Sequence, residues 1–242
     1  MTESTRIALV TGASRGLGLV IARVLARRGY SLVIGGRERG ALDSAAVELS
    51  ADAPAVRPIP GDITDAQVRV AMIDAARQLG GLNVLVNNAA QLGPVGPLQT
   101  FDVPSFGRLF PVNVGAPLVL TQLALPLLVE RQGLIVNITS DAADAAYPGW
   151  GPYGATKAAL ELLTRTLAAE LREQGVSAVL VDPGDMRTRM HQESLPGQDI
   201  SDRPLPEITV PFWNWLFDQD PNAVRGERFG AQHEDARWLQ RV

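Results

Sequence analysis

Short apolar runs alternate with segments of helical periodicity along almost the whole chain. Near-continuous apolar runs are typical of strands that are covered on both faces of a parallel sheet. Such runs lie at residues 6–11, 31–35, 55–59, 83–86, 134–139 and 176–181. Between them, apolar residues three and four positions apart predict helices, which lie at residues 16–28, 41–49, 64–79, 104–131 and 153–173. Strands that alternate with helices predict an α/β fold of Rossmann type, with a doubly wound parallel sheet.

Prolines and one polar segment modify this pattern. Prolines in and next to residues 55–59 predict a strand at the edge of the sheet rather than at its centre. Pro111, Pro117 and Pro126 predict bends or breaks within the helix at 104–131. Residues 185–206 are polar, rich in proline and glycine, and longer than an ordinary connection. We expect this segment to form a lid that is poorly ordered without ligand and closes over the site. The alternative is a long surface excursion that never touches the substrate.

Composition narrows the range of functions. The 242 residues, of which 46% are hydrophobic, suffice for one core and indicate a single domain over residues 1–242. The net charge of −4 gives no general attraction to phosphate, so neither a nucleic acid nor a membrane is an expected partner. The chain has no cysteine and only two histidines, which argues against disulfides, thiolate chemistry and a metal site. Because the N-terminus resembles no signal segment, we expect a cytoplasmic location.

Residues 11–18 (TGASRGLG) connect the first predicted strand to the first predicted helix. Their glycines permit a tight turn and close approach of the backbone to a ligand. The helix start offers free N–H groups and a positive dipole end to a pyrophosphate. A glycine turn that only joins strand to helix is the alternative, but the strand before it and the helix after it favour dinucleotide binding.

Two arginines predict which dinucleotide binds. An acidic residue after the second strand would bind the ribose 2′-hydroxyl of NAD, but the residues there are Gly35-Gly36-Arg37. Arg37 and Arg15 would instead pair with a 2′-phosphate, unless both are ordinary surface charges, and we therefore expect NADP(H). Asp62, after the third strand, either binds the adenine amino group or caps the helix that follows.

A serine, a tyrosine and the only lysine of the chain carry the strongest chemical signal. Ser140 follows the fifth strand, so it is expected in the crevice at the carboxyl edge of the sheet. Tyr153 and Lys157 are four residues apart on a predicted helix and therefore share a face. A nearby ammonium favours the phenolate, so Lys157 is expected to lower the pKa of Tyr153 toward the neutral range. A surface Tyr–Lys pair is the alternative.

Taken together, these motifs resemble the short-chain dehydrogenase/reductase family. They follow the family's order over residues 5–190 and comprise TGASRGLG at 11–18, NNAA at 87–90, Asn113, Ser140, YGATK at 153–157 and Pro183-Gly184. The chain departs from the family at two places. Ala90 replaces the usual glycine, and residues 226–242 lack the usual Asp-Gly-Gly ending, which puts a subunit contact through the C-terminal strand in question.

The resemblance implies a role for individual residues. Tyr153 would exchange the proton, Lys157 would hold the nicotinamide ribose, and Ser140 would orient the substrate oxygen. Asn113 would maintain a water-mediated proton relay, and Thr188 would contact the nicotinamide carboxamide. The expected cofactor-binding residues are Gly12, Ser14, Arg15, Gly16, Leu17, Gly18, Arg37, Asp62, Ile63, Asn88, Ala89, Lys157, Pro183, Gly184, Met186 and Thr188. The expected substrate-binding residues are Ser140, Tyr147, Trp150, Tyr153 and Met190, and no metal is expected.

The resulting prediction is an NADPH-dependent ketone reductase, equivalent to an alcohol dehydrogenase in the reverse direction, with a small-molecule carbonyl or alcohol substrate. A narrower alternative is a 3-oxoacyl thioester reductase. An alternative from another class is a non-catalytic, NADP-sensing interaction protein. Such a protein could dispense with Ser140, Tyr153 or Lys157, and this sequence has all three.

The sequence also carries expectations about surfaces. In the family that the chain resembles, the helices near 104–131 and 153–174 commonly form a dimer contact. Ala159, Leu163 and Leu167 predict an apolar outer face on the second of them, so we expect a homodimer or a homotetramer. The aromatic segment at 212–217 predicts core packing, with a substrate wall or a subunit contact as the alternative.

Overall fold

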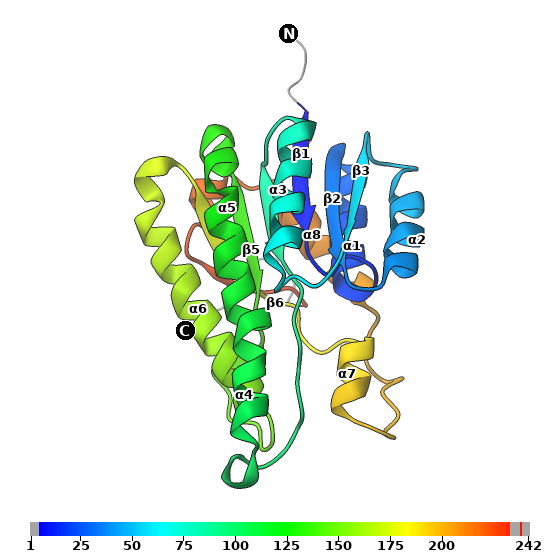
Figure 1. Ribbon diagram of the computed structural model, residues 1–242, viewed down its shortest axis with the longest axis vertical. Coiled ribbons are helices and arrows are strands. Elements are labelled where there is room, and N and C mark those ends of the chain that lie inside the picture. Colours follow the sequence, from blue (N-terminus) through cyan, green and yellow to red (C-terminus); the bar gives the residue numbers. More distant parts are fainter. Residues whose placement is uncertain (1–4, 233–237, 239–242) are drawn as a thin grey trace.

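A parallel sheet of seven strands runs through the centre of the computed structural model, which describes residues 5–232 and residue 238 (Figure 1). The strands lie in the order β3-β2-β1-β4-β5-β6-β7, and every neighbouring pair is parallel. Their bounds are β1 (Arg6–Val10), β2 (Tyr30–Gly36), β3 (Val56–Pro60), β4 (Val84–Asn87), β5 (Leu134–Ile138), β6 (Ser177–Asp182) and β7 (Arg228–Gly230). The predicted doubly wound sheet is confirmed, and its strand order reverses between β1 and β4, where ligands of such sheets bind.

Helices cover both faces of this sheet (Figure 1). Successive residues of β1 show why, because Ala8 and Val10 join one hydrophobic core while Ile7 and Leu9 join the other. The first core is closed by α1 (Gly16–Arg27), α2 (Arg39–Leu49) and α8 (Val210–Leu216). The second is closed by α3 (Ala66–Leu79), α5 (Ala116–Arg131) and α6 (Gly151–Glu170). Two shorter helices, α4 (Val103–Phe110) and α7 (Arg189–Ser194), lie beyond the carboxyl edge of the sheet.

Prolines act at the edge strand and in the long helical stretch. The edge position predicted for residues 55–59 is confirmed, because β3 is the last strand on its side of the sheet. Between α4 and α5, a π-helical turn spans Pro111–Gly115, so the helix predicted at 104–131 is divided there. Pro126, in contrast, lies within α5 without ending it. Both Pro126 and Gln122, whose carbonyl loses its hydrogen bond, are exposed, so water can satisfy that carbonyl.

The stretch Val103–Arg131 has the length and composition of a helix that could span a membrane. It is the one helical stretch among residues 5–232 that is long and apolar enough to cross a membrane, and half of its most apolar part is buried inside the fold. A core helix that covers a sheet meets the same criterion.

The C-terminal part contains elements that the periodicity did not predict. The strand β7 has only three residues and begins with Arg228, so it carries no apolar run. Helices α7 and α8 have six and seven residues, too few to show helical periodicity. Within α8, Phe212 and Trp213 are fully buried, which confirms that this aromatic segment is core packing. The rest of the expectation for residues 226–242 falls partly on 233–237 and 239–242, which lie outside the described residues.

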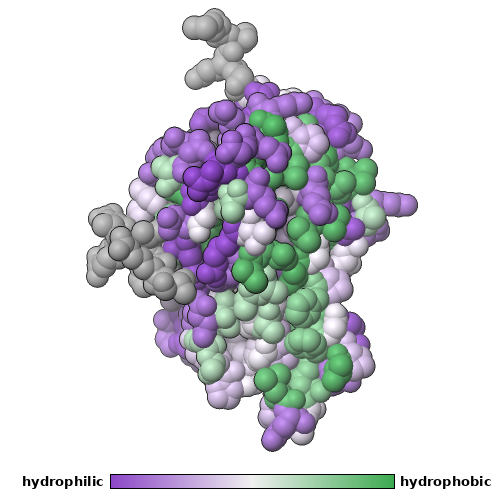
Figure 2. Space-filling view, turned by 90° about the vertical axis from the view of Figure 1, so that its left-hand side faces the viewer, coloured by the Kyte–Doolittle hydropathy of each residue, from purple (hydrophilic) through white to green (hydrophobic). Residues whose placement is uncertain are grey.

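The outer face of α6 differs from its prediction. Ala159, Leu163 and Leu167 are half-buried rather than exposed, because α6 is partly covered by its neighbours. Leu162, in contrast, is 67% exposed, and Leu98 and Val103 are exposed as well. Figure 2 shows hydrophobic and neutral residues gathered over the lower half of this side, where Figure 1 places α4 and the start of α6.

Candidate active site

A cavity of about 860 Å³ opens at the carboxyl ends of the strands. It is lined by the segments that follow strands β1 to β6, by α7 and by the segment before α8. The predicted site residues that line it are Gly12, Ser14, Arg15, Gly16, Leu17, Gly18, Arg37, Asp62, Ile63, Asn88, Ala89, Tyr153, Lys157, Pro183, Met186, Thr188 and Met190. Those that lie behind or beside its lining are Asn113, Ser140, Tyr147, Trp150 and Gly184.

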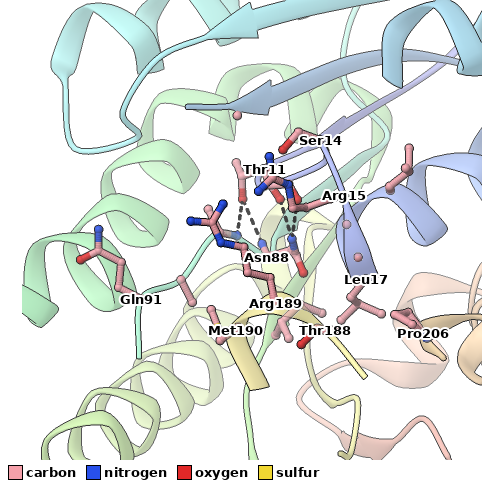
Figure 3. Close-up of a pocket in the computed structure, with 18 of the residues that line it drawn as sticks. Thr11, Ser14, Arg15, Leu17, Asn88, Gln91, Thr188, Arg189, Met190 and Pro206 are labelled. Carbon is pink, nitrogen blue, oxygen red and sulfur yellow. Dashed lines mark hydrogen bonds between the residues drawn. The ribbon is translucent and has the colours of Figure 1, made fainter. Parts of the chain in front are cut away.

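The glycine-rich loop is fixed by the segment that follows β4. Thr11 Oγ1 accepts hydrogen bonds from the backbone N–H groups of Asn88 and Ala89, at 2.9 and 3.0 Å. The Asn88 side chain donates to the carbonyl oxygens of Thr11 (2.8 Å) and Gly12 (3.2 Å), as the dashed lines in Figure 3 show. Asn88 therefore fixes the backbone of the loop through its amide, while Ser14, Arg15 and Leu17 of the loop line the cavity.

Two glycines of the loop have no room for a side chain. Gly12 has φ +66°, and a Cβ there would lie 2.8 Å from Asn88 Nδ2. A Cβ on Gly18 would lie 2.3 Å from the carbonyl oxygen of Gly12. The helix α1 begins at Gly16, so its first N–H groups lie at the cavity, as an anion-binding loop requires. These residues fit the pyrophosphate of a dinucleotide.

A carboxylate pairs with one of the two arginines expected at a 2′-phosphate. Glu38, directly after Arg37, forms an ion pair with Arg15 and a second one with Arg189 of α7 at 3.0 Å. Figure 3 draws Arg15 and Arg189 among the residues that line the cavity. The ion pair with Arg15 lowers the pKa of Glu38. Sequence reasoning missed Glu38 and Arg189, since nothing local indicates that residues 38 and 189 meet.

Asp62 lies at the cavity but does not cap the following helix. Its Oδ1 accepts hydrogen bonds from the N–H and the hydroxyl of Thr64, at 2.8 and 2.7 Å. These hydrogen bonds, together with the charge of Arg37, lower the pKa of Asp62. The cap of α3 is Asp65, which accepts from the N–H of Gln67 at 2.8 Å. The capping alternative for Asp62 is therefore wrong, and its carboxylate remains a candidate for contact with a base.

Tyr153 and Lys157 lie at the inner end of the cavity, on the first two turns of α6. Tyr153 is 8% exposed and Lys157 is 3% exposed. The ammonium Nζ of Lys157 donates to the carbonyl oxygen of Ile138 at 2.7 Å and lies 5.5 Å from the centre of the Tyr153 ring. Ser140, at the end of the segment after β5, donates from Oγ to Asp141 Oδ1 at 3.0 Å. The fold therefore brings the three predicted residues together.

Burial has the largest effect on the pKa values of Tyr153 and Lys157. Burial raises the pKa of Tyr153, the negative charges of Asp182 and Asp141 raise it further, and the Ser140 hydroxyl acts weakly in the opposite direction. Burial also lowers the pKa of Lys157 to about 8, against the effects of Asp182 and Glu161. The expected lowering of the Tyr153 pKa by Lys157 is thus not what this structure shows. The sequence revealed the neighbouring charge but not the depth at which both groups are buried.

Asn113 belongs to the π-helical turn and is 1% exposed. Its side chain exchanges two hydrogen bonds of 2.8 Å with the backbone of Gln91 and donates to Thr156 Oγ1 at 3.0 Å. The amide is thereby fully engaged, so any part of Asn113 in a proton relay would fall to its main chain. Its side chain fixes the segment at Gln91, which lines the cavity, against α6.

A small apolar cluster forms the wall beside Tyr153. Leu92 and Ala142 are buried against the Tyr153 ring, and Trp150 and Met190 pack against them. The Trp150 ring meets the Tyr153 ring edge-on, with 5.8 Å between the centroids. Tyr147 lies further out, 45% exposed, and its hydroxyl donates to Asp141 Oδ2 at 2.5 Å. Met190 therefore lines the cavity as predicted, Trp150 supports the wall from behind, and sequence reasoning missed Leu92.

The segment predicted as a lid forms part of the cavity wall. Met186, Thr188, Arg189, Met190 and Glu193 line the cavity, so the segment reaches the site. It contains the short helix α7, capped by the Thr188 hydroxyl, which accepts from the N–H of His191 at 3.2 Å. Within residues 5–232 and 238, no group of three or more histidine or acidic side chains is placed to hold a metal ion.

Comparisons with known proteins agree with this geometry. Residues 6–199 match the sequence profile of the family described as short chain dehydrogenase. The chain is 34% identical to gluconate 5-dehydrogenase from Gluconobacter oxydans over 197 residues, which cover 81% of this chain and 77% of the relative. The structure of a short chain dehydrogenase from Salmonella enterica superposes with a TM-score of 0.84 at 30% identity, covering 95% and 97% of the two chains. An alcohol dehydrogenase from Thermococcus sibiricus, complexed with 5-hydroxy-NADP, gives a TM-score of 0.83 at 28% identity, covering 96% and 99%.

Proposed function

Because the chain belongs to the short-chain dehydrogenase family, whose members are NAD(P)-dependent oxidoreductases acting on CH–OH and C=O groups, we propose that it is an NADPH-dependent ketone reductase. The observation that carries the proposal is the buried Tyr153 next to Ser140 and Lys157, at the inner end of a cavity that begins at a glycine-rich loop. A raised pKa keeps the Tyr153 phenol protonated at neutral pH, and carbonyl reduction requires a proton donor.

The residues that line the cavity suit a dinucleotide. Gly12 and Gly18 leave the space that a pyrophosphate needs, and the start of α1 supplies N–H groups. Asp62 and Ile63 would flank the adenine, while Lys157 and Thr188 would hold the nicotinamide end. When bound, the reduced nicotinamide supplies a hydride to the carbonyl carbon.

The residues of the chain supply the remaining steps. Ser140 orients the carbonyl oxygen, and Tyr153 donates its phenolic proton to that oxygen as the carbon is reduced. The Lys157 ammonium, held by the Ile138 carbonyl, stabilises the resulting phenolate until it is protonated again. The lid segment excludes water from this end of the cavity.

The substrate side favours an apolar ketone. Leu92, Met190 and the Trp150 behind them form an apolar wall next to Tyr153. The test is NADPH oxidation by the purified protein, followed at 340 nm with a panel of aliphatic, aromatic and 3-oxoacyl thioester ketones. Turnover of simple ketones supports the proposal. Turnover of the thioesters alone would identify a thioester reductase, and turnover of none would contradict enzymatic ketone reduction.

Cofactor choice gives a prediction at Arg37. Charge-assisted hydrogen bonds are worth about 1.5–3 kcal/mol, so removing one costs roughly 10–150-fold in affinity. We expect wild-type protein to prefer NADPH to NADH, and Arg37→Asp to raise the KM for NADPH by that factor and to change the KM for NADH much less. The matched control is Arg39→Asp, because Arg39 is exposed and lies outside the cavity lining. Equal wild-type KM values for the two cofactors would contradict the assignment.

The exposed apolar residues support a homodimer. Leu98 in the turn before α4, Val103 at the start of α4 and Leu162 of α6 expose apolar side chains. Contiguous apolar patches on a surface are a feature of subunit contacts. We expect the mass of a dimer or a tetramer in light scattering at micromolar concentration, and Leu162→Glu to shift the mass toward that of the monomer. A monomeric wild-type mass would overturn this part of the proposal.

A further inference from the structure

Arg228 of β7 forms a buried ionic cluster directly behind the candidate active site. It is 7% exposed, and its Nε donates to Oε1 of Glu161, which is 1% exposed, at 2.9 Å. Its Nη2 lies 3.5 Å from Asp182 Oδ2 and 3.6 Å from Asp144 Oδ2. A buried arginine that faces three carboxylates is costly to desolvate, so this arrangement calls for an explanation beyond stability.

Arg228 and Glu161 also hold the residues that follow β5. Arg228 Nη2 donates to the carbonyl oxygen of Ser140 at 3.2 Å. Glu161 Oε1 accepts from the Thr139 hydroxyl at 2.8 Å, and Thr139 lines the cavity. Glu161 also lies one helical turn after Lys157 on α6. The ion pair therefore connects β7, the Thr139–Ser140 segment and the helix that carries Tyr153 and Lys157.

We propose that Arg228 and Glu161 are positioning residues, which hold Ser140 in register with Tyr153 and Lys157 and set the balance of charge around Lys157. They contact neither substrate nor cofactor in this assignment, since both are buried and lie behind Thr139 and Ser140, which they hold. Two measurements test this proposal: the titration of Lys157, which does not depend on the proposed ketone reduction, and the kinetics of that reduction, which do.

The neighbouring charges shift the pKa of Lys157 in directions that can be stated for each of them. Lys157 faces Glu161 on its own helix, Asp182 at the end of β6 and the phenol of Tyr153, and both carboxylates favour its ammonium form. Tyr153 in turn faces Asp182, Asp141 and Ser140. Arg228 offsets Glu161 and Asp182, and Arg165 on the same helix also pairs with Glu161, at 2.6 Å. Loss of Arg228 therefore raises the pKa of Lys157, and loss of the Glu161 charge lowers it.

The sole lysine allows a direct test without substrate or cofactor. In protein labelled with ¹³C at lysine Cε, a single side-chain signal reports the titration of Lys157. We expect a wild-type pKa of about 8, an upward shift of about one unit in Arg228→Met and a downward shift in Glu161→Gln. Glu161→Gln keeps an oxygen that can accept from Thr139, so it changes the charge with little change of shape.

The opposite signs separate this proposal from a merely structural role. Loosened packing would admit water at Lys157 and raise its pKa in both variants, because burial is what lowers it. The control is Arg225→Gln, which removes a half-buried arginine that donates to the Val176 carbonyl at the opposite end of the sheet. It should leave the Lys157 titration unchanged. If Arg228→Met does not fold, Glu161→Gln decides alone: a lowered pKa supports the proposal, and an unchanged or raised pKa overturns it.

The kinetic measurement tests the positioning of Ser140. Arg228→Lys keeps the positive charge but loses the fork that reaches both Glu161 and the Ser140 carbonyl. We expect kcat to fall by about 10–100-fold while the KM for NADPH changes by less than about twofold. An unchanged kcat would overturn the positioning role. A wild-type protein without turnover would instead contradict the proposed function and leave the titration result standing.

Discussion

Tyr153→Phe is expected to lower kcat by about 10²–10⁴-fold, the range attributed to a single general acid. The substitution removes the transferable proton and keeps the ring, which is 8% exposed and packs edge-on against Trp150. The apolar wall should therefore survive, and the affinity for NADPH should stay close to that of wild type. The measurements are kcat with a saturating ketone and the dissociation constant of NADPH by titration calorimetry.

The chain offers a matched control for this experiment. It has three tyrosines, and Tyr30 lies at the start of β2, at the end of the sheet away from the cavity, with the Arg6 guanidinium over its ring. Tyr30→Phe removes the same atom and should leave kcat unchanged. Substantial turnover by Tyr153→Phe would exclude Tyr153 as the proton donor, whatever its position in the cavity.

The features that the sequence predicts well are those that residues close together in the chain determine. The glycine-rich loop is a run of eight residues between a strand and a helix, and Tyr153 and Lys157 share one helix face. Ser140 follows an apolar run, so the direction of a parallel strand is enough to place it at the carboxyl edge. Each of these inferences needs only the spacing of neighbouring residues. The structure brings the loop, Tyr153 and Lys157 to one cavity and places Ser140 beside its lining.

What the sequence did not predict depends on contacts between distant parts of the chain. Glu38 meets Arg189 across 151 positions, and Glu161 meets Arg228 across 67, and no periodicity reports such pairs. The strand β7 is too short and too polar to resemble a buried strand, and it forms because β6 offers it an open edge. The sequence predicts a lowered pKa for Tyr153, whereas burial raises it. The depth of burial depends on the whole fold and not on the neighbouring residues alone.

Gly18→Ala is expected to reduce NADPH affinity by at least about tenfold, and to lower the stability of the protein by about 1–3 kcal/mol, the usual cost of overpacking. A Cβ at residue 18 would lie 2.3 Å from the Gly12 carbonyl oxygen and 2.5 Å from Asn88 Nδ2. Neither atom can retreat freely, because the Asn88 amide already holds the carbonyl oxygens of Thr11 and Gly12. The clash must therefore displace the loop that lines the cavity, which couples cofactor affinity to stability at this one position.

Gly40→Ala is the matched control for Gly18→Ala. Gly40 is exposed in the first turn of α2, and a Cβ there would meet nothing within 4 Å. Alanine favours a helix over glycine by up to about 1 kcal/mol, so this variant should melt at the same or a higher temperature and bind NADPH as wild type does. For a chain of this length, 1–3 kcal/mol corresponds to a fall in Tm of roughly 2–12 °C in Gly18→Ala. If Gly18→Ala instead binds NADPH as tightly as Gly40→Ala does, the glycine-rich loop does not hold the pyrophosphate in the way that its geometry indicates.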